Sequence, residues 1–142
     1  MKTLSVPNDV LASMADEYLS KGKEAVLRVK GRSMRPFLRD EIDSVRLVKK
    51  DTVEVGDMVF ARIGGSRYVL HRVIGVDGES LTLMGDGNIR GTESCLKGDV
   101  LGTVVEILPP DGRGHAPCNG RWWRMLLPLR RYILFILKFF GR

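Results

Sequence analysis

The sequence lacks the apolar segments that would carry a chain through a membrane. No stretch of its 142 residues reaches the roughly 18 to 20 uncharged apolar residues that a spanning helix needs. Near the N-terminus, Asp9, Asp16 and Glu17 interrupt what would have to be the apolar core of a signal peptide. We therefore expect neither an export signal nor a spanning anchor, and hence a cytoplasmic protein.

Cysteine and histidine are scarce, with two of each. Cys95 and Cys118 have no metal-ligand spacing and no histidine cluster beside them, so we expect no metal, no cofactor and a reduced intracellular chain. His115 lies in "PPDGRGHAPCNG", where nothing fixes its ring, whereas His71 lies in an apolar segment that predicts a strand. His71 is therefore the better candidate for a residue that exchanges protons.

Acidic residues are absent from the C-terminal part. Residues 1–111 carry 16 Lys and Arg against 17 Asp and Glu, whereas residues 112–142 carry seven basic residues and no acidic one. A nucleic-acid-binding protein more often spreads its basic surface over the folded domain, so we expect no nucleic-acid partner. This uneven distribution of charge favours an anionic membrane surface or an acidic partner for the tail. The oligomeric state stays open.

The tail itself, "RWWRMLLPLRRYILFILKFFGR" over residues 121–142, predicts an amphipathic helix. At about 100° per residue, one narrow basic stripe is made by Arg124, Arg131, Lys138 and Arg142. Arg130 falls off this stripe, and Pro128 is expected to kink or divide the helix. Such a helix suits the headgroup region of an anionic membrane, where it would hold the protein at the inner surface. The same apolar surface would also suit packing on the domain or on a partner.

The remainder predicts a mainly β fold, a compact antiparallel sheet or partly open barrel. Short segments rich in Val, Ile and Leu, separated by Gly and Asp, lie at residues 25–29, 45–48, 58–63, 68–76, 81–84 and 100–108. Before them, Asn8 is expected to cap a short helix that ends near Lys21 and Gly22. We divide the chain into a β domain with this helix (1–110), a linker (111–120) and the amphipathic tail (121–142).

Two turn signals, "GGS" after Ile63 and "DGE" after Val76, predict a three-stranded meander over residues 58–85 with His71 in its central strand. A two-residue turn at Asp77 and Gly78 makes His71 face Met84, and one at Gly78 and Glu79 makes it face Asp86. In both registers His71 and Asp86 share a face of the sheet. A three-residue loop would instead put His71 and Asp86 on opposite faces.

The segment "VKGRSMRPFL", residues 29–38, predicts a turn that presents Ser33. Gly31 can adopt backbone angles closed to other residues, and Pro36 stiffens the exit. A serine hydroxyl becomes a nucleophile when a base takes its proton, and His71 is the candidate base. A carboxylate on the other ring nitrogen would hold the tautomer, a role we assign to Asp86. The amide of Ser33 itself would help stabilise an oxyanion.

Four segments, "GRSMRPFL", "VGDMVFAR", "VLHRVIG" and "MGDGN", follow the order and approximate spacing of the characteristic boxes of the signal peptidase I and LexA-type serine protease clan. The chain resembles that clan over well under half of its length. The resemblance implies that Ser33 is the nucleophile. It is closest to the Ser-His branch, the archaeal and endoplasmic-reticulum-type signal peptidases, because His71 stands where other members carry a lysine. Asp86 then corresponds to the assisting aspartate.

The resemblance implies a serine endopeptidase that forms an acyl-enzyme and cleaves a protein or peptide precursor without a cofactor. Three features depart from the clan. A further acidic position is not matched cleanly, because Gly91 and Thr92 lie there with Glu93 just beyond. The sequence pattern predicts neither the membrane anchor of a signal peptidase nor the helix-turn-helix of a LexA-type protein. The alternative is a non-catalytic member that binds peptides or partners.

Overall fold

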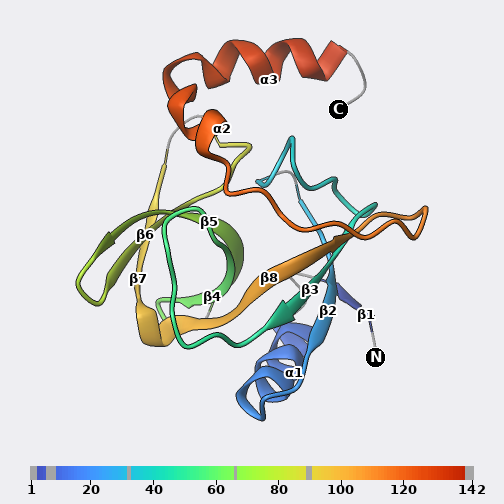
Figure 1. Cartoon of the computed structure of the whole chain (residues 1–142), viewed down its shortest axis with the longest axis vertical. Coiled ribbons are helices and arrows are strands. Elements are labelled where there is room, and N and C mark those ends of the chain that lie inside the picture. The colour runs from blue at the N-terminus through green and yellow to red at the C-terminus, as the bar shows by residue number, and fades with distance from the viewer. Residues whose placement is uncertain (1–2, 6–8, 32, 66, 89–90, 140–142) are drawn as a thin grey trace.

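The computed structural model describes residues 3–5, 9–31, 33–65, 67–88 and 91–139. Within these ranges one sheet has the strand order β1-β2-β3-β8-β4-β5-β6-β7, with β1 parallel to β2 and all other neighbours antiparallel (Figure 1). Its strands are β1 (Thr3–Ser5), β2 (Ala25–Arg28), β3 (Ser44–Val48), β4 (Met58–Ile63), β5 (Arg67–Asp77), β6 (Ser80–Met84), β7 (Glu93–Leu96) and β8 (Val100–Leu108). A short 3-10 helix, η1 (Lys97–Asp99), links β7 to β8. The mainly β, antiparallel fold is confirmed.

The N-terminal helix is also confirmed, as α1 (Asp9–Ser20). It packs against β2 and β8 and buries Ala12, Ala15 and Leu19, which recur at helical spacing. Asn8, the predicted cap, lies outside the described residues.

Strand β4 is buried on both faces, and this places it at the centre of the fold. Phe60 faces a core shared with α1, β2 and β3, whereas Val59 and Ala61 face a second core shared with β5, β6 and β7. Alternate residues of a strand point to opposite faces, so a continuous apolar run fits a strand covered on both sides. The neighbouring strand β5 is therefore held rigidly where it carries His71.

The predicted meander forms as β4, β5 and β6, and its second turn is the two-residue turn at Gly78 and Glu79. Near this turn Gly75 pairs with Thr82, but beyond a bulge between Val73 and Gly75 the pairing becomes Arg72 with Met84. A bulge adds one residue to one strand and reverses which residues share a face. The predicted shared face of His71 and Asp86 is therefore wrong, because the bulge puts Arg72 in that relation to Asp86.

The C-terminal tail is divided at Pro128, as predicted, so no single helix runs through its described part, residues 121–139. It forms α2 (Arg121–Met125), the 3-10 turn η2 (Leu127–Leu129) and α3 (Arg130–Phe139). In Figure 1, α3 lies at the end of the molecule opposite to α1. None of the helices in the described ranges is long and apolar enough to cross a bilayer. Arg142, the last member of the predicted basic stripe, lies outside the described residues.

Candidate active site

Ser33 begins a turn that is anchored on both sides. Before it, Gly31 has φ of 90° and donates its N–H to Oδ1 of Asp40 at 2.7 Å, a conformation that favours glycine. After it, the amides of Phe37 and Leu38 both donate to the carbonyl of Met34, at 3.1 and 3.0 Å. Met34 and Leu38 are buried in the core. Ser33 is therefore presented by a turn in which the following residue, Met34, is fixed by packing in the core.

His71 lies on β5, paired with Val59 of β4, and shares a cleft with Ser33. The cleft holds about 140 Å³ and is lined by Val29, Lys30, Gly31, Ser33, Met34, Tyr68, Val69, Leu70 and His71. The fold thus brings the predicted nucleophile and base to one site from separate elements. No direct hydrogen bond joins the two side chains among the described residues, and such bonds often tighten only when substrate binds.

His71 is 8% exposed. Burial lowers its pKa below the ordinary value of 6.5, while the charges of Glu93 and Asp86 raise it and that of Arg67 lowers it. The imidazole is therefore neutral at pH 7, which is the form that accepts a proton. In the described part of the chain no group bonds its buried Nδ1.

Asp86 does not make the predicted hydrogen bond to His71. Its carboxylate accepts three hydrogen bonds from Arg72, two from Nε at 2.9 and 3.1 Å and one from Nη2 at 2.7 Å. Both side chains are buried, Arg72 at 0% and Asp86 at 2% exposure. Burial raises the pKa of the Asp86 carboxyl, and the hydrogen bonds from Arg72 oppose that shift. Because the bulge in β5 turns Arg72 toward Asp86, the ion pair replaces the expected contact.

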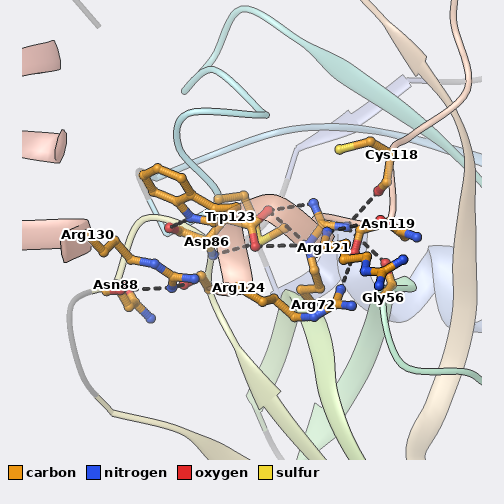
Figure 2. Close-up of polar contacts among 12 residues, drawn as sticks. Gly56, Arg72, Asp86, Asn88, Cys118, Asn119, Arg121, Trp123, Arg124 and Arg130 are labelled. Carbon is orange, nitrogen blue, oxygen red and sulfur yellow. Dashed lines mark hydrogen bonds and ion pairs between the residues drawn. The ribbon is translucent and has the colours of Figure 1, made fainter. Parts of the chain in front are cut away.

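Arg72 also ties this pair to two other segments. Its Nη1 donates to the carbonyls of Gly56 at 2.9 Å and Cys118 at 2.7 Å (Figure 2). Its guanidinium lies 5.2 Å from the ring centroid of Phe37. Arg72 is therefore a buried structural residue that joins β5, the support of Asp86 and the C-terminal segment.

The turn at residues 85–88, here called the support loop, contacts the serine through its backbone. The amide of Gly87 donates to the carbonyl of Ser33 at 2.7 Å. A Cβ on Gly85 would collide with that same carbonyl oxygen, so the close approach requires glycine. The amide of Asp86 points to Sδ of Met34 at 3.5 Å. The "MGDGN" segment therefore holds the main chain of the serine turn.

Two residues of the C-terminal segment complete the site and were missed from the sequence. Nε1 of Trp123 donates to the carbonyl of Asp86 at 2.5 Å, and Nη1 of Arg130 donates to the carbonyls of Gly85 and Asn88 at 3.3 and 3.1 Å (Figure 2). Both side chains are buried. The one signal in the sequence was the position of Arg130 off the basic stripe.

Glu93, to which the sequence pattern assigns no role, raises the pKa of His71 more than any other acid that acts on it. It lies on β7 and pairs through both carboxylate oxygens with Arg67 of β5. Its charge raises the pKa of His71 more than the charge of Asp86 does. In the described ranges no three His, Cys, Asp or Glu side chains gather as metal ligands would.

Comparison with known proteins links this site to one family. Residues 2–105 match the family model described as Peptidase S24-like. The match includes Ser33, His71 and Asp86 and excludes Trp123 and Arg130. A search of the curated proteins found no match.

Proposed function

The chain belongs to the S24-like peptidase family, and we propose that it is a serine endopeptidase with Ser33 as nucleophile and His71 as general base. The observation that carries this proposal is the common cleft. Ser33 is presented by a glycine-containing turn, and His71 is presented by β5 within its buried stretch, residues 69–73. A neutral imidazole beside a serine hydroxyl is the arrangement that makes the hydroxyl reactive.

The reaction follows from the protonation states. Neutral His71 accepts the proton of the Ser33 hydroxyl while the oxygen attacks the substrate carbonyl, and the resulting imidazolium donates that proton to the leaving amine. An acyl-enzyme on Ser33 remains. Water then gives a proton to His71 and attacks the ester, and the imidazolium passes that proton to the leaving Ser33 oxygen, which releases the acid and restores both side chains. We assign stabilisation of the oxyanion to the Ser33 amide.

Asp86 takes a different part in this proposal from the one expected of a triad aspartate. Its carboxylate is bonded to Arg72, so it acts on the site by holding the support loop and by its negative charge. That charge favours the imidazolium, since it raises the pKa of His71. The chemistry is therefore that of a Ser-His dyad, and Asp86 acts on His71 through its charge without a hydrogen bond to the ring.

The substrate we propose is an extended segment of a protein or peptide precursor. The cleft is lined largely by apolar groups, including Val29, Met34 and Leu70. Its volume of about 140 Å³ is small, so it suits a small apolar side chain beside the bond that is cut.

A fluorophosphonate probe tests the assignment, because it reacts with an activated serine. We expect labelling of the parent at Ser33, no labelling of Ser33→Ala, and labelling of His71→Gln at least about 100-fold slower, the usual effect of losing a general base. Mass spectrometry of the digested protein identifies the labelled peptide. Equal labelling of Ser33→Ala and the parent would overturn the proposal.

Two observations favour the alternative, a non-catalytic peptide-binding member of the family. Asp86 is bonded to Arg72, and Nδ1 of His71 has no partner in the described ranges. On that alternative the folded parent resists the probe even at high concentration. A peptide library then still yields binders, and Leu70→Asp, which places a charge in the cleft, abolishes their binding.

We also propose that the tail attaches the protein peripherally to an anionic membrane. Apolar side chains between residues 125 and 136 are exposed, among them Leu129 at 53%, Tyr132 at 62% and Ile136 at 54%. Arg121 and Arg131, basic residues of the tail that are exposed, suit anionic headgroups. The cytoplasmic location and the division into domain, linker and tail stay predictions.

Vesicle sedimentation tests the attachment without disturbing the support loop. We expect vesicles rich in phosphatidylglycerol to bring down the parent but not the double variant Tyr132→Glu/Ile136→Glu. The variant Ile42→Glu/Leu96→Glu adds the same charge at exposed apolar positions of the β domain, and it should sediment like the parent. Equal loss in both variants would show simple charge repulsion and defeat the proposal.

A further inference from the structure

The C-terminal segment, outside the family match, holds the support loop in place. Three of the four carbonyls in this loop accept hydrogen bonds from two side chains, those of Gly85 and Asn88 from Arg130 and that of Asp86 from Trp123. These bonds satisfy main-chain groups that are otherwise costly to bury. Figure 2 shows Arg130 and Arg72 reaching the loop from different sides.

The same loop bonds the residue that carries the proposed nucleophile. The Gly87 amide donates to the Ser33 carbonyl at 2.7 Å, and Gly85 lies so close to that carbonyl that a side chain would not fit. A path of two contacts therefore runs from Trp123 or Arg130 to Ser33. A shift of the loop moves the serine peptide with it.

The placement of Arg130 is not explained by packing alone. It is 2% exposed, its Nε has no partner in the described ranges, and the Asp86 carboxylate beside it is already bonded to Arg72. A buried cation with incomplete partners costs more than an apolar side chain of similar size. Its guanidinium lies 5.1 Å from the ring centroid of Trp123, which recovers part of that cost. The two side chains thus form one unit against the loop.

We propose that Trp123 and Arg130 are positioning residues of the serine turn. They fix the support loop and, through the Gly87 amide, fix the orientation of Ser33 toward His71. This inference rests on the proposed function. Because a misplacement of about 1 Å can cost about 100-fold in rate, loss of either contact slows the chemical step. Binding in the cleft is unaffected, since neither residue lines it.

The first measurement is saturable labelling by the fluorophosphonate probe, made on folded protein well below the unfolding temperature. Trp123→Phe keeps an aromatic ring and removes the N–H together with part of the indole volume, and Arg130→Met keeps most of the bulk and removes the donors. We expect both to lower the limiting labelling rate about 10- to 100-fold, with an unchanged half-saturating concentration. Arg130→Lys should recover part of the rate. Arg131→Met, its exposed neighbour, is the matched control and should label like the parent.

The second measurement does not depend on chemistry. Hydrogen exchange at the Gly87 amide, followed by NMR, should become faster in Trp123→Phe and Arg130→Met and stay at the parent rate in Arg131→Met. If Arg130→Met does not fold, Trp123→Phe decides alone. Unchanged labelling and unchanged Gly87 exchange in folded Trp123→Phe would overturn the inference. A parent that is never labelled at Ser33 would overturn the proposed function instead, and faster Gly87 exchange would still support the role of Trp123 in holding the loop.

Discussion

The buried pair of Arg72 and Asp86 supports a quantitative prediction about stability. Arg72→Met removes the guanidinium that donates hydrogen bonds to the carboxylate of Asp86 and to the carbonyls of Gly56 and Cys118. Removing one partner of a buried ion pair costs about 3 to 5 kcal/mol, because the other charge stays buried and uncompensated. For a chain of 142 residues that lowers the melting temperature by about 10 to 17 °C.

The cost should depend on pH in a defined direction. Burial already raises the pKa of Asp86 above its ordinary value of 3.8, and removal of Arg72 takes away the hydrogen bonds that oppose this shift. A carboxyl with a raised pKa holds its proton in the folded state and loses it in the unfolded state. The folded state is then favoured at low pH, and the stability of Arg72→Met falls as pH rises above about 4.

Urea unfolding, followed by tryptophan fluorescence, measures these free energies. We expect the double variant Arg72→Met/Asp86→Leu to be more stable than Arg72→Met, because it contains no buried lone charge. Arg113→Met, at an exposed position, is the control and should lie within about 0.5 kcal/mol of the parent. A loss below about 1 kcal/mol for Arg72→Met, or simple additivity in the double variant, would refute the reasoning.

Two further predictions concern the chemistry at Ser33. The acid limb of the pH–labelling profile should have its midpoint below pH 6.5, because burial lowers the pKa of His71. Glu93→Gln should lower this midpoint further, because it removes a charge that raises the pKa of His71. A midpoint above pH 6.5, or an upward shift in the variant, would contradict this. Gly85→Ala should slow labelling at least about 10-fold, since its Cβ displaces the Ser33 carbonyl, whereas Gly98→Ala, where the added Cβ meets open space, should label at the parent rate.

Local patterns in the sequence were sufficient for most of the fold. The alternation of apolar residues, the glycine turns and the helical spacing before Lys21 each involve neighbours in the chain, and they placed α1 and six of the strands. Strands β1 and β7 were missed because each is short and contains at most two apolar residues, whereas the equally short β2 is mostly apolar. The meeting of Ser33 and His71 was predictable only through the resemblance to a clan, since no local rule joins a turn to a distant strand.

The partners of Asp86 could not be read from the sequence. One extra residue in β5, between Val73 and Gly75, exchanges the faces of His71 and Arg72, and no turn signal marks it. Whether a strand bulges depends on how both of its faces pack, which is a property of the folded chain. Parity arguments fail at such a point because each inserted residue reverses every side chain beyond it.

The sequence by itself determined most of the elements, the turn that presents Ser33 and the amphipathic character of the tail, because these depend on residues close together in the chain. Only the tertiary structure decided that Arg72 binds Asp86 and that Trp123 and Arg130 support the loop beneath the serine. Amphipathicity describes which face of a helix is apolar, and it does not say which side chain will cross into a neighbouring site. That choice is made by contacts between distant segments, where buried carbonyls must find donors.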